Sequence, residues 1–152
     1  MPTISNYTYD ELSTGQRATF ARQVSDRDIE GFAEICGDRN PVHLDDEFAA
    51  RTAFGGRIAH GMLTGAFISA ALAMTLPGPG TVYLSQSLRF RAPVKPGDEI
   101  TVELEVIEKL DRRRRVTLDC KAYNQARKLV VSGTAEVMAP EEKMMIELPE
   151  PD

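Results

Sequence analysis

Cysteine and histidine are scarce in this 152-residue sequence, with two of each. Cys36 and Cys120 are the only cysteines and form no CxxC pair, which excludes a zinc ribbon and a dithiol redox site. Basic residues are outnumbered, with 18 Lys and Arg against 23 Asp and Glu, and the net charge of −5 argues against nucleic acid as a partner. The first residues contain neither a basic nor an apolar segment, so we expect no secretory signal there.

Long apolar runs are also lacking. The longest, residues 61–76, is interrupted by Thr64 and Ser69 and is shorter than the ~20 residues that span a bilayer. We therefore expect a cytoplasmic protein with no membrane partner. Because 42% of the residues are hydrophobic, the chain can fill one core, and we predict a single domain over residues 1–140. Residues 141–152 form an acidic tail that we expect to be peripheral or mobile.

Two segments have the pattern of helices. In residues 25–37, Ser25 and Asp28 form a capping-box start, apolar residues recur at helical spacing, and Gly37 is suited to the end. A loop over 38–43 and a weaker helical segment over 45–51 follow. Residues 60–76 are apolar on nearly all sides, which predicts a buried helix that ends at the Pro- and Gly-rich segment after it.

The second half of the chain has the period of two that is typical of strands. Alternating segments cover 82–91, 100–106 and 116–122, and a less regular segment with Gly133 as a candidate bulge covers 129–138. Short turns between alternating strands indicate antiparallel pairing with one face on a core. The sequence therefore predicts an α+β domain whose antiparallel sheet wraps around the buried helix, and unpaired strand edges favour a homodimer.

The two histidines narrow the search for catalytic residues. Asp38 and His43, in a loop with Asn40, could hold a water molecule as an acid–base pair, although Asp, Asn and Pro are equally suited to a turn. Gly61 follows His60 at a helix start, where free amides could bind a developing oxyanion, or where a helix simply begins. A metal site of Asp38 with both histidines is conceivable but lacks the usual spacing, and no serine has the setting of a hydrolase nucleophile.

The basic residues fall into two groups. The run 112–115 separates two strands and is best interpreted as a solvated hairpin tip. Arg89 and Arg91 lie on one face of a strand, with Lys95 beyond it, so they could bind the phosphates of an extended ligand. The alternative is a charged outer face of the sheet.

Three blocks of residues together resemble a known family. Residues 32–43 (FAEICGDRNPVH) with Phe48 and Ala49, the block 57–62 (RIAHGM), and residues 76–90 resemble, in the same order, the MaoC-like (R)-specific enoyl-CoA hydratases. The likeness extends from about Tyr9 to Pro140. It implies a hot-dog fold, usually dimeric, and hydration of trans-2-enoyl-CoA to (R)-3-hydroxyacyl-CoA or the reverse, for polyhydroxyalkanoate synthesis or fatty-acid metabolism.

The resemblance also implies roles for particular residues. Asp38 and His43 match the catalytic pair, the Gly61 amide matches the oxyanion hole, and no cofactor is needed beyond the coenzyme A of the substrate. Ser69 and Leu72 match positions that line the acyl pocket, and Asn40 lies within the motif. An acyl-thioesterase or an acyl-carrier-protein dehydratase on the same fold, or a binding module without activity, remain alternatives at this point.

Overall fold

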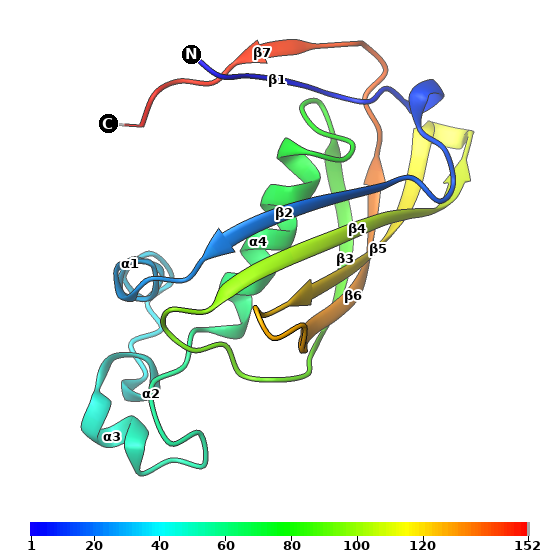
Figure 1. Ribbon diagram of the computed structural model, residues 1–152. Helices are drawn as coiled ribbons and strands as arrows, with labels where there is room; N and C mark the ends of the chain where they lie inside the picture. The colour runs from blue at the N-terminus through cyan, green and yellow to red at the C-terminus, as the bar shows by residue number, and fades with distance from the viewer. Residues whose placement is uncertain (152) are drawn as a thin grey trace.

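The computed structural model describes residues 1–151, and its main feature is a curved antiparallel sheet (Figure 1). Its strands are β2 (Arg17–Gln23), β3 (Val82–Phe90), β4 (Glu99–Leu110), β5 (Arg115–Tyr123) and β6 (Leu129–Met138), in the spatial order β2-β4-β5-β6-β3. The sheet wraps around the helix α4 (Gly61–Met74), as the sequence predicted. In the described part of the chain, no helix is long and apolar enough to cross a membrane.

Strands β4 and β5 show why the sheet curves around α4. The concave face presents Ile100, Val102, Leu104 and Val106 from β4 and Val116, Leu118, Cys120 and Ala122 from β5, all at most 1% exposed. Apart from Ile107, their neighbours along each strand are charged or polar and lie on the outer face, because successive side chains of a strand point to opposite faces. The predicted alternation is therefore confirmed, and it places the core between the sheet and the helix.

Helix α4 fills the concave face because it is apolar on almost all sides. Leu63, Phe67, Ile68, Ala71 and Leu72 are at most 8% exposed. Burying each of the four larger side chains contributes about 1.5–3 kcal/mol to folding. The helix begins after His60 and ends at Thr75, before the segment that contains two prolines and two glycines.

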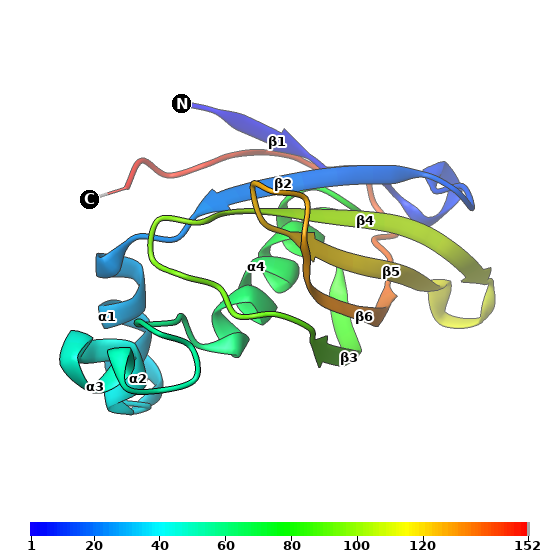
Figure 2. The same ribbon diagram turned by 60° about the horizontal axis from the view of Figure 1, so that its bottom comes forward.

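The shorter helices gather at the amino-terminal end of α4 (Figure 2). They are α1 (Asp26–Cys36), α2 (Pro41–Leu44) and α3 (Asp46–Ala50). Ser25 and Asp28 form the predicted capping box of α1, and Gly37 ends it at φ 81°. Helix α2 lies where the sequence predicted only a loop, because four residues are too few to show a helical period.

The remaining elements are two short strands and two 3-10 turns, and the sequence did not predict all of the strands. The sequence did not predict β2, whose exposed outer residues and polar sequence hide its alternation. Strands β1 (Thr3–Ser5) and β7 (Met145–Glu147) pair in antiparallel fashion above the carboxyl end of α4. The turns are η1 (Tyr9–Glu11) and η2 (Arg112–Arg114), and the second forms the predicted hairpin tip between β4 and β5.

The acidic tail is thus partly a strand, which the sequence did not predict. Its anchor is the buried side chain of Asn6, which donates hydrogen bonds to the carbonyls of Pro79 and Glu142 and accepts one from the Met144 amide. These contacts join the two ends of the chain to the loop after α4. Pairing between residues so distant in sequence leaves no local pattern to detect.

The expectation of a bulge at Gly133 is wrong. Gly133 is in regular register with Leu88 on one side and Cys120 on the other, and the irregularities lie between Tyr83 and Ser85, Val106 and Glu108, and Ala122 and Tyr123. A Cβ atom at Gly133 would lie 1.8 Å from the carbonyl oxygen of Ser87. The glycine is needed because β3 approaches β6 too closely for any side chain.

Candidate active site

The loop between α1 and α2 presents Asp38. Gly37 turns the chain out of α1, and the Asn40 amide donates to Oδ1 of Asp38 at 3.2 Å. The Asn40 side chain accepts a hydrogen bond from the Val42 amide at 3.1 Å and so caps α2. Asn40 therefore shapes the loop, while the second carboxylate oxygen of Asp38 is left to face its partner.

That partner is His43, a buried side chain in the last turn of α2. Its Nδ1 donates to the carbonyl of Ile58 at 2.7 Å, so in the neutral ring Nε2 is the acceptor. Nε2 lies 3.6 Å from Oδ2 of Asp38, too far for a direct hydrogen bond. Two acceptors at this separation are suited to one water molecule that donates a hydrogen bond to each.

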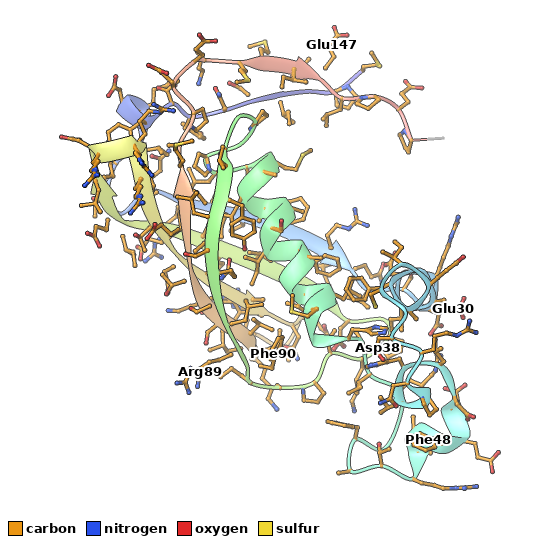
Figure 3. The ribbon with its side chains drawn as sticks, turned by 180° about the vertical axis from the view of Figure 1, so that it is seen from behind. Glu30, Asp38, Phe48, Arg89, Phe90 and Glu147 are labelled. Atoms are coloured by element: carbon orange, nitrogen blue, oxygen red, sulfur yellow. The ribbon has the colours of Figure 1, made fainter. Side chains whose placement is uncertain are left out.

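The start of α4 contributes the third predicted group, the amide of Gly61. It is the first residue of the helix, and the first amides of a helix have no carbonyl acceptor within it. A Cβ atom here would lie 2.7 Å from two atoms of the Phe90 ring. Glycine thus lets Phe90 pack against the helix start, and Figure 3 shows Asp38 and Phe90 at this same end of α4.

Two largely apolar cavities flank Phe90 and Met62, which line both. One, of about 560 Å³, lies around the start of α4, and its lining includes Gly61, Thr64 and Val94. The other, of about 530 Å³, lies between α4 and β3, and its lining comprises Phe32, Met62, Gly65, Ala66, Ser69, Tyr83, Gln86, Leu88 and Phe90. An extended ligand with an apolar end fits this pair of cavities, with its polar part near Gly61.

The predicted substrate-binding residues do not all line a cavity in the structure. Ser69, predicted to line the acyl pocket, lines the second cavity. Leu72 is 2% exposed within the core and lines neither cavity. Arg91 lines the first cavity and donates to the Ser132 hydroxyl at 3.0 Å. Arg89 points away from α4 (Figure 3) and pairs in register with the same Ser132, so the two arginines lie on one face of the strand, as predicted.

Sequence reasoning missed the other cavity-lining residues on β3. The Tyr83 hydroxyl donates a hydrogen bond to the side-chain oxygen of Gln86. Burial, with a smaller effect of Cys120, raises the pKa of Tyr83 to about 12, so the hydroxyl stays protonated at neutral pH. The sequence showed that Gln86 shares one strand face with Leu84 and Leu88, but not that this face lines a cavity beside the helix. Tyr83 joins this face through the irregularity between Tyr83 and Ser85.

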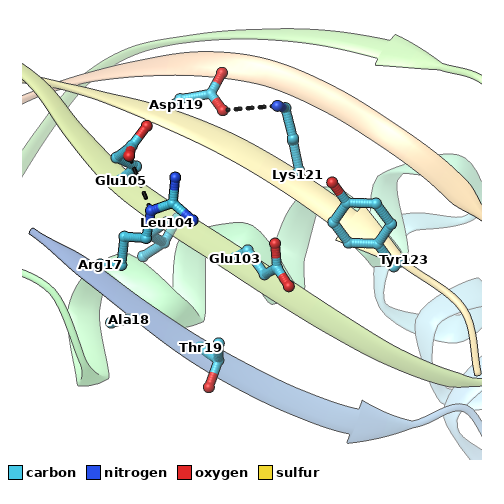
Figure 4. Close-up of a pocket in the computed structure, with 9 residues that line it drawn as sticks. All are labelled: Arg17, Ala18, Thr19, Glu103, Leu104, Glu105, Asp119, Lys121 and Tyr123. Atoms are coloured by element: carbon cyan, nitrogen blue, oxygen red, sulfur yellow. Dashed lines mark hydrogen bonds and ion pairs between the residues drawn. The ribbon is translucent and has the colours of Figure 1, made fainter. Parts of the chain in front are cut away.

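A third hollow lies on the convex face of the sheet and is polar (Figure 4). Its walls come from β2, β4 and β5 and consist mostly of their outward-facing charged side chains. Arg17 pairs with Glu105 at 2.9 Å, and Lys121 pairs with Asp119 at 3.6 Å. These charges are already paired with one another, and the hollow contains none of the predicted site residues.

Asp38, His43 and His60 also bring one potential metal ligand each within 4.8 Å of one another. The rings of His43 and His60 stack, with centroids 3.7 Å apart and planes inclined by 26°. Lone pairs of stacked rings lie in nearly parallel planes and do not converge on one point, unlike the ligands of a tetrahedral zinc site. The cluster is therefore better suited to proton transfer than to metal binding.

The antiparallel sheet around α4, with a site at the start of that helix, defines a hot-dog-fold protein. The family model described as "MaoC like domain" matches residues 10–126. A 3-hydroxybutyryl-CoA dehydratase from Methylorubrum extorquens is 46% identical over 143 residues, 94% of this chain and 90% of that protein. The chain therefore belongs to the MaoC-like domain family.

Solved structures agree with this assignment. The unliganded R-hydratase PhaJ1 from Pseudomonas aeruginosa is 55% identical, with a TM-score of 0.95, over 99% of this chain and 97% of that one. The (R)-hydratase from Aeromonas caviae involved in PHA biosynthesis is 41% identical, with a TM-score of 0.82, over 85% of this chain and 98% of that one. The resemblance inferred from the motifs is confirmed.

Proposed function

We propose that this protein hydrates trans-2-enoyl-CoA to (R)-3-hydroxyacyl-CoA and catalyses the reverse dehydration. The observation that carries the proposal is the 3.6 Å gap between Asp38 Oδ2 and His43 Nε2, beside the cavities that share Phe90. Similarity to a 3-hydroxybutyryl-CoA dehydratase and to two R-hydratases supports the substrate class and the stereochemistry. The Aeromonas caviae neighbour supports a role in supplying polyhydroxyalkanoate monomers.

The proposed reaction begins with water held between the two acceptors. Its oxygen forms a bond to C3 of the enoyl group while Asp38 or His43 takes one of its protons. The electron pair of the double bond moves towards the thioester, and C2 then receives a proton from the same pair of residues. One water is added across the double bond, and the site returns to its starting protonation state.

Negative charge develops on the thioester oxygen during this step. The Gly61 amide is positioned to donate a hydrogen bond to it, reinforced by the positive end of the α4 dipole. A donor fixed by a helix needs no reorganisation when the charge forms, so its effect is greater in the transition state than in the ground state. Hydration involves no net oxidation, and we propose that no metal or redox cofactor takes part.

We further propose that the acyl chain is short. Gly65 faces Leu88 and Gly61 faces Phe90, so the cavity between α4 and β3 extends from Phe90 towards Ser69. The hydrogen-bonded Tyr83 and Gln86 lie at the end distant from Gly61 and limit its length. The four-carbon substrate in the name of the Methylorubrum extorquens relative agrees with this limit.

The working form is proposed to be a homodimer in the cytoplasm. Strand β3 lies at one edge of the sheet and pairs only with β6 among the described residues. Val82, Tyr83, Leu84 and Phe90 on this strand are 41–56% exposed, an apolar edge that a second copy would cover. Light scattering is expected to give about twice 16.8 kDa, and Leu84→Glu is expected to lower that mass.

The assay that tests the proposed function follows the loss of ultraviolet absorbance when the conjugated double bond of 2-butenoyl-CoA is hydrated. Chiral analysis is expected to give the (R) product, and longer 2-enoyl-CoA substrates are expected to react with lower kcat/KM. Release of free thiol without hydration would instead show a thioesterase. Binding of the thioester without turnover would show a binding module, and either result rejects the proposal.

A further inference from the structure

His60 lies at the junction of the three groups placed in the active site. It is the residue before Gly61, and it is only 4% exposed. One face of its ring stacks on His43, with centroids 3.7 Å apart, and its ring also contacts Phe32, with centroids 5.0 Å apart. The stacked ring therefore limits how far the His43 imidazole can move on that side.

A hydrogen bond connects the same ring to Asp38. Nε2 of His60 lies 2.9 Å from the backbone carbonyl oxygen of Asp38, 22 residues earlier in the chain. A carbonyl only accepts, so Nε2 carries the proton and donates. This bond joins the start of α4 to the exposed loop that presents the Asp38 carboxylate, half of which is accessible to solvent.

The other ring nitrogen, Nδ1, indicates that packing alone does not explain why a histidine occupies this position. Among the described residues, Nδ1 of His60 has no hydrogen-bond partner although it is buried. An unpaired buried acceptor is unfavourable, and an apolar ring would fill the same space without it. The position therefore requires the Nε2 donor that only the histidine, or another side chain with an N–H group, supplies.

We propose that His60 is a positioning residue of the hydration reaction, which fixes the spacing of Asp38 and His43 through the carbonyl bond and the ring stack. The proposal rests on the proposed hydratase function. Without His60, the loop would let the Asp38 carboxylate drift relative to Nε2 of His43, and the water between them would lose its alignment. Misplacement by about 1 Å is enough to reduce a rate about 100-fold.

Two substitutions separate the donor from the ring. His60→Phe keeps a stacking ring and loses the donor, whereas His60→Gln keeps an N–H donor and loses the ring. We expect H60F to lower kcat about 10- to 100-fold with KM within about threefold, because alignment acts on the chemical step rather than on binding. We expect H60Q to recover several-fold of that loss, since its amide can donate to the Asp38 carbonyl.

A third comparison distinguishes positioning from general structural damage. In an Asp38→Asn background, the carboxylate that His60 positions is already gone, so H60F should lower the residual rate less than about threefold. Structural damage would reduce both backgrounds by the same factor. Tyr9→Phe is the matched control, because it removes a side-chain hydrogen bond to Asp111 far from the site and is expected to leave kcat unchanged.

The outcomes are separable. Wild-type kcat in H60F, an H60Q enzyme as slow as H60F, or an equal H60F penalty in both backgrounds would each overturn the role of His60 while the hydratase function stands. A wild-type protein that does not hydrate 2-enoyl-CoA would overturn the proposed function itself. If H60F does not fold, as shown by its melting curve, the comparison of H60Q with wild type in both backgrounds decides the question.

Discussion

Removing the proton-accepting groups one at a time is the most direct test of the active site. Asp38→Asn keeps the size of the side chain, and its oxygen can still accept from the Asn40 amide at Oδ1. His43→Gln keeps a donor that can reach the Ile58 carbonyl now bound by Nδ1. Neither change opens a cavity in the core, so both variants are expected to fold and to keep the wild-type mass.

The expected loss follows from the geometry. Each variant removes one of two acceptors 3.6 Å apart, which we propose share one water. General acid–base assistance is worth about 10²–10⁴ in rate, which is about 3–5 kcal/mol of barrier. Because the water loses its alignment when either acceptor is gone, the double variant should be little slower than the slower single variant.

The assay is steady-state hydration of 2-butenoyl-CoA, with thermal melting and scattering mass as controls. A double variant whose loss equals the product of the two single losses would show that Asp38 and His43 act independently, contrary to a shared water. Folded single variants with nearly wild-type kcat would refute the assignment of the pair altogether.

Three further predictions concern stability. Leu72→Ala removes a side chain buried in the core, so urea denaturation should show that the free energy of unfolding falls by about 2–5 kcal/mol. The dependence of kcat/KM on acyl chain length should not change. A broader range of accepted chain lengths would show that Leu72 contacts the acyl chain after all. Gly133→Ala forces a methyl group against the Ser87 carbonyl and should cost more than about 4 kcal/mol in the same experiment, whereas a small loss would show that β3 shifts freely. Burial raises the pKa of the Cys120 thiol from 9.0 to about 11, so the unfolded chain loses this proton first and stability falls between those pH values. In denaturation measured as a function of pH, Cys120→Ala should reduce this loss of stability by at most about 3 kcal/mol. An equal loss in the variant would show that the Cys120 thiol is not its cause.

Local patterns predicted most of the architecture. The capping box at Ser25, the apolar segment that became α4, and the alternation in β4 and β5 each depend on neighbours within about one helical turn or one strand. Strand β2 and the pairing of β1 with β7 were missed. Their partners lie far away in sequence, and their own residues carry too little apolar alternation.

The candidate site divides in a similar way. The spacing of Asp38 and His43 is local, and a motif of twelve residues, 32–43, was enough to identify both. The sequence could not predict which of the substrate-binding candidates line a cavity, because that depends on the neighbours that each side chain contacts. These candidates were Arg89, Arg91, Ser69 and Leu72. Leu72 shares an apolar helix with Ser69, yet it is buried in the core while Ser69 lines the cavity beside β3.

The sequence by itself therefore determined most of the elements, the family resemblance and the candidate acid–base pair. The tertiary structure decided the 3.6 Å separation of that pair, the protonated nitrogen on each histidine, and the contact of His60 with Asp38. The physical reason is that tautomers and spacings are set by backbone carbonyls and rings contributed by other segments. Residues 38, 43, 58 and 60 converge only when the sheet closes around α4 and the short helices pack at its amino-terminal end.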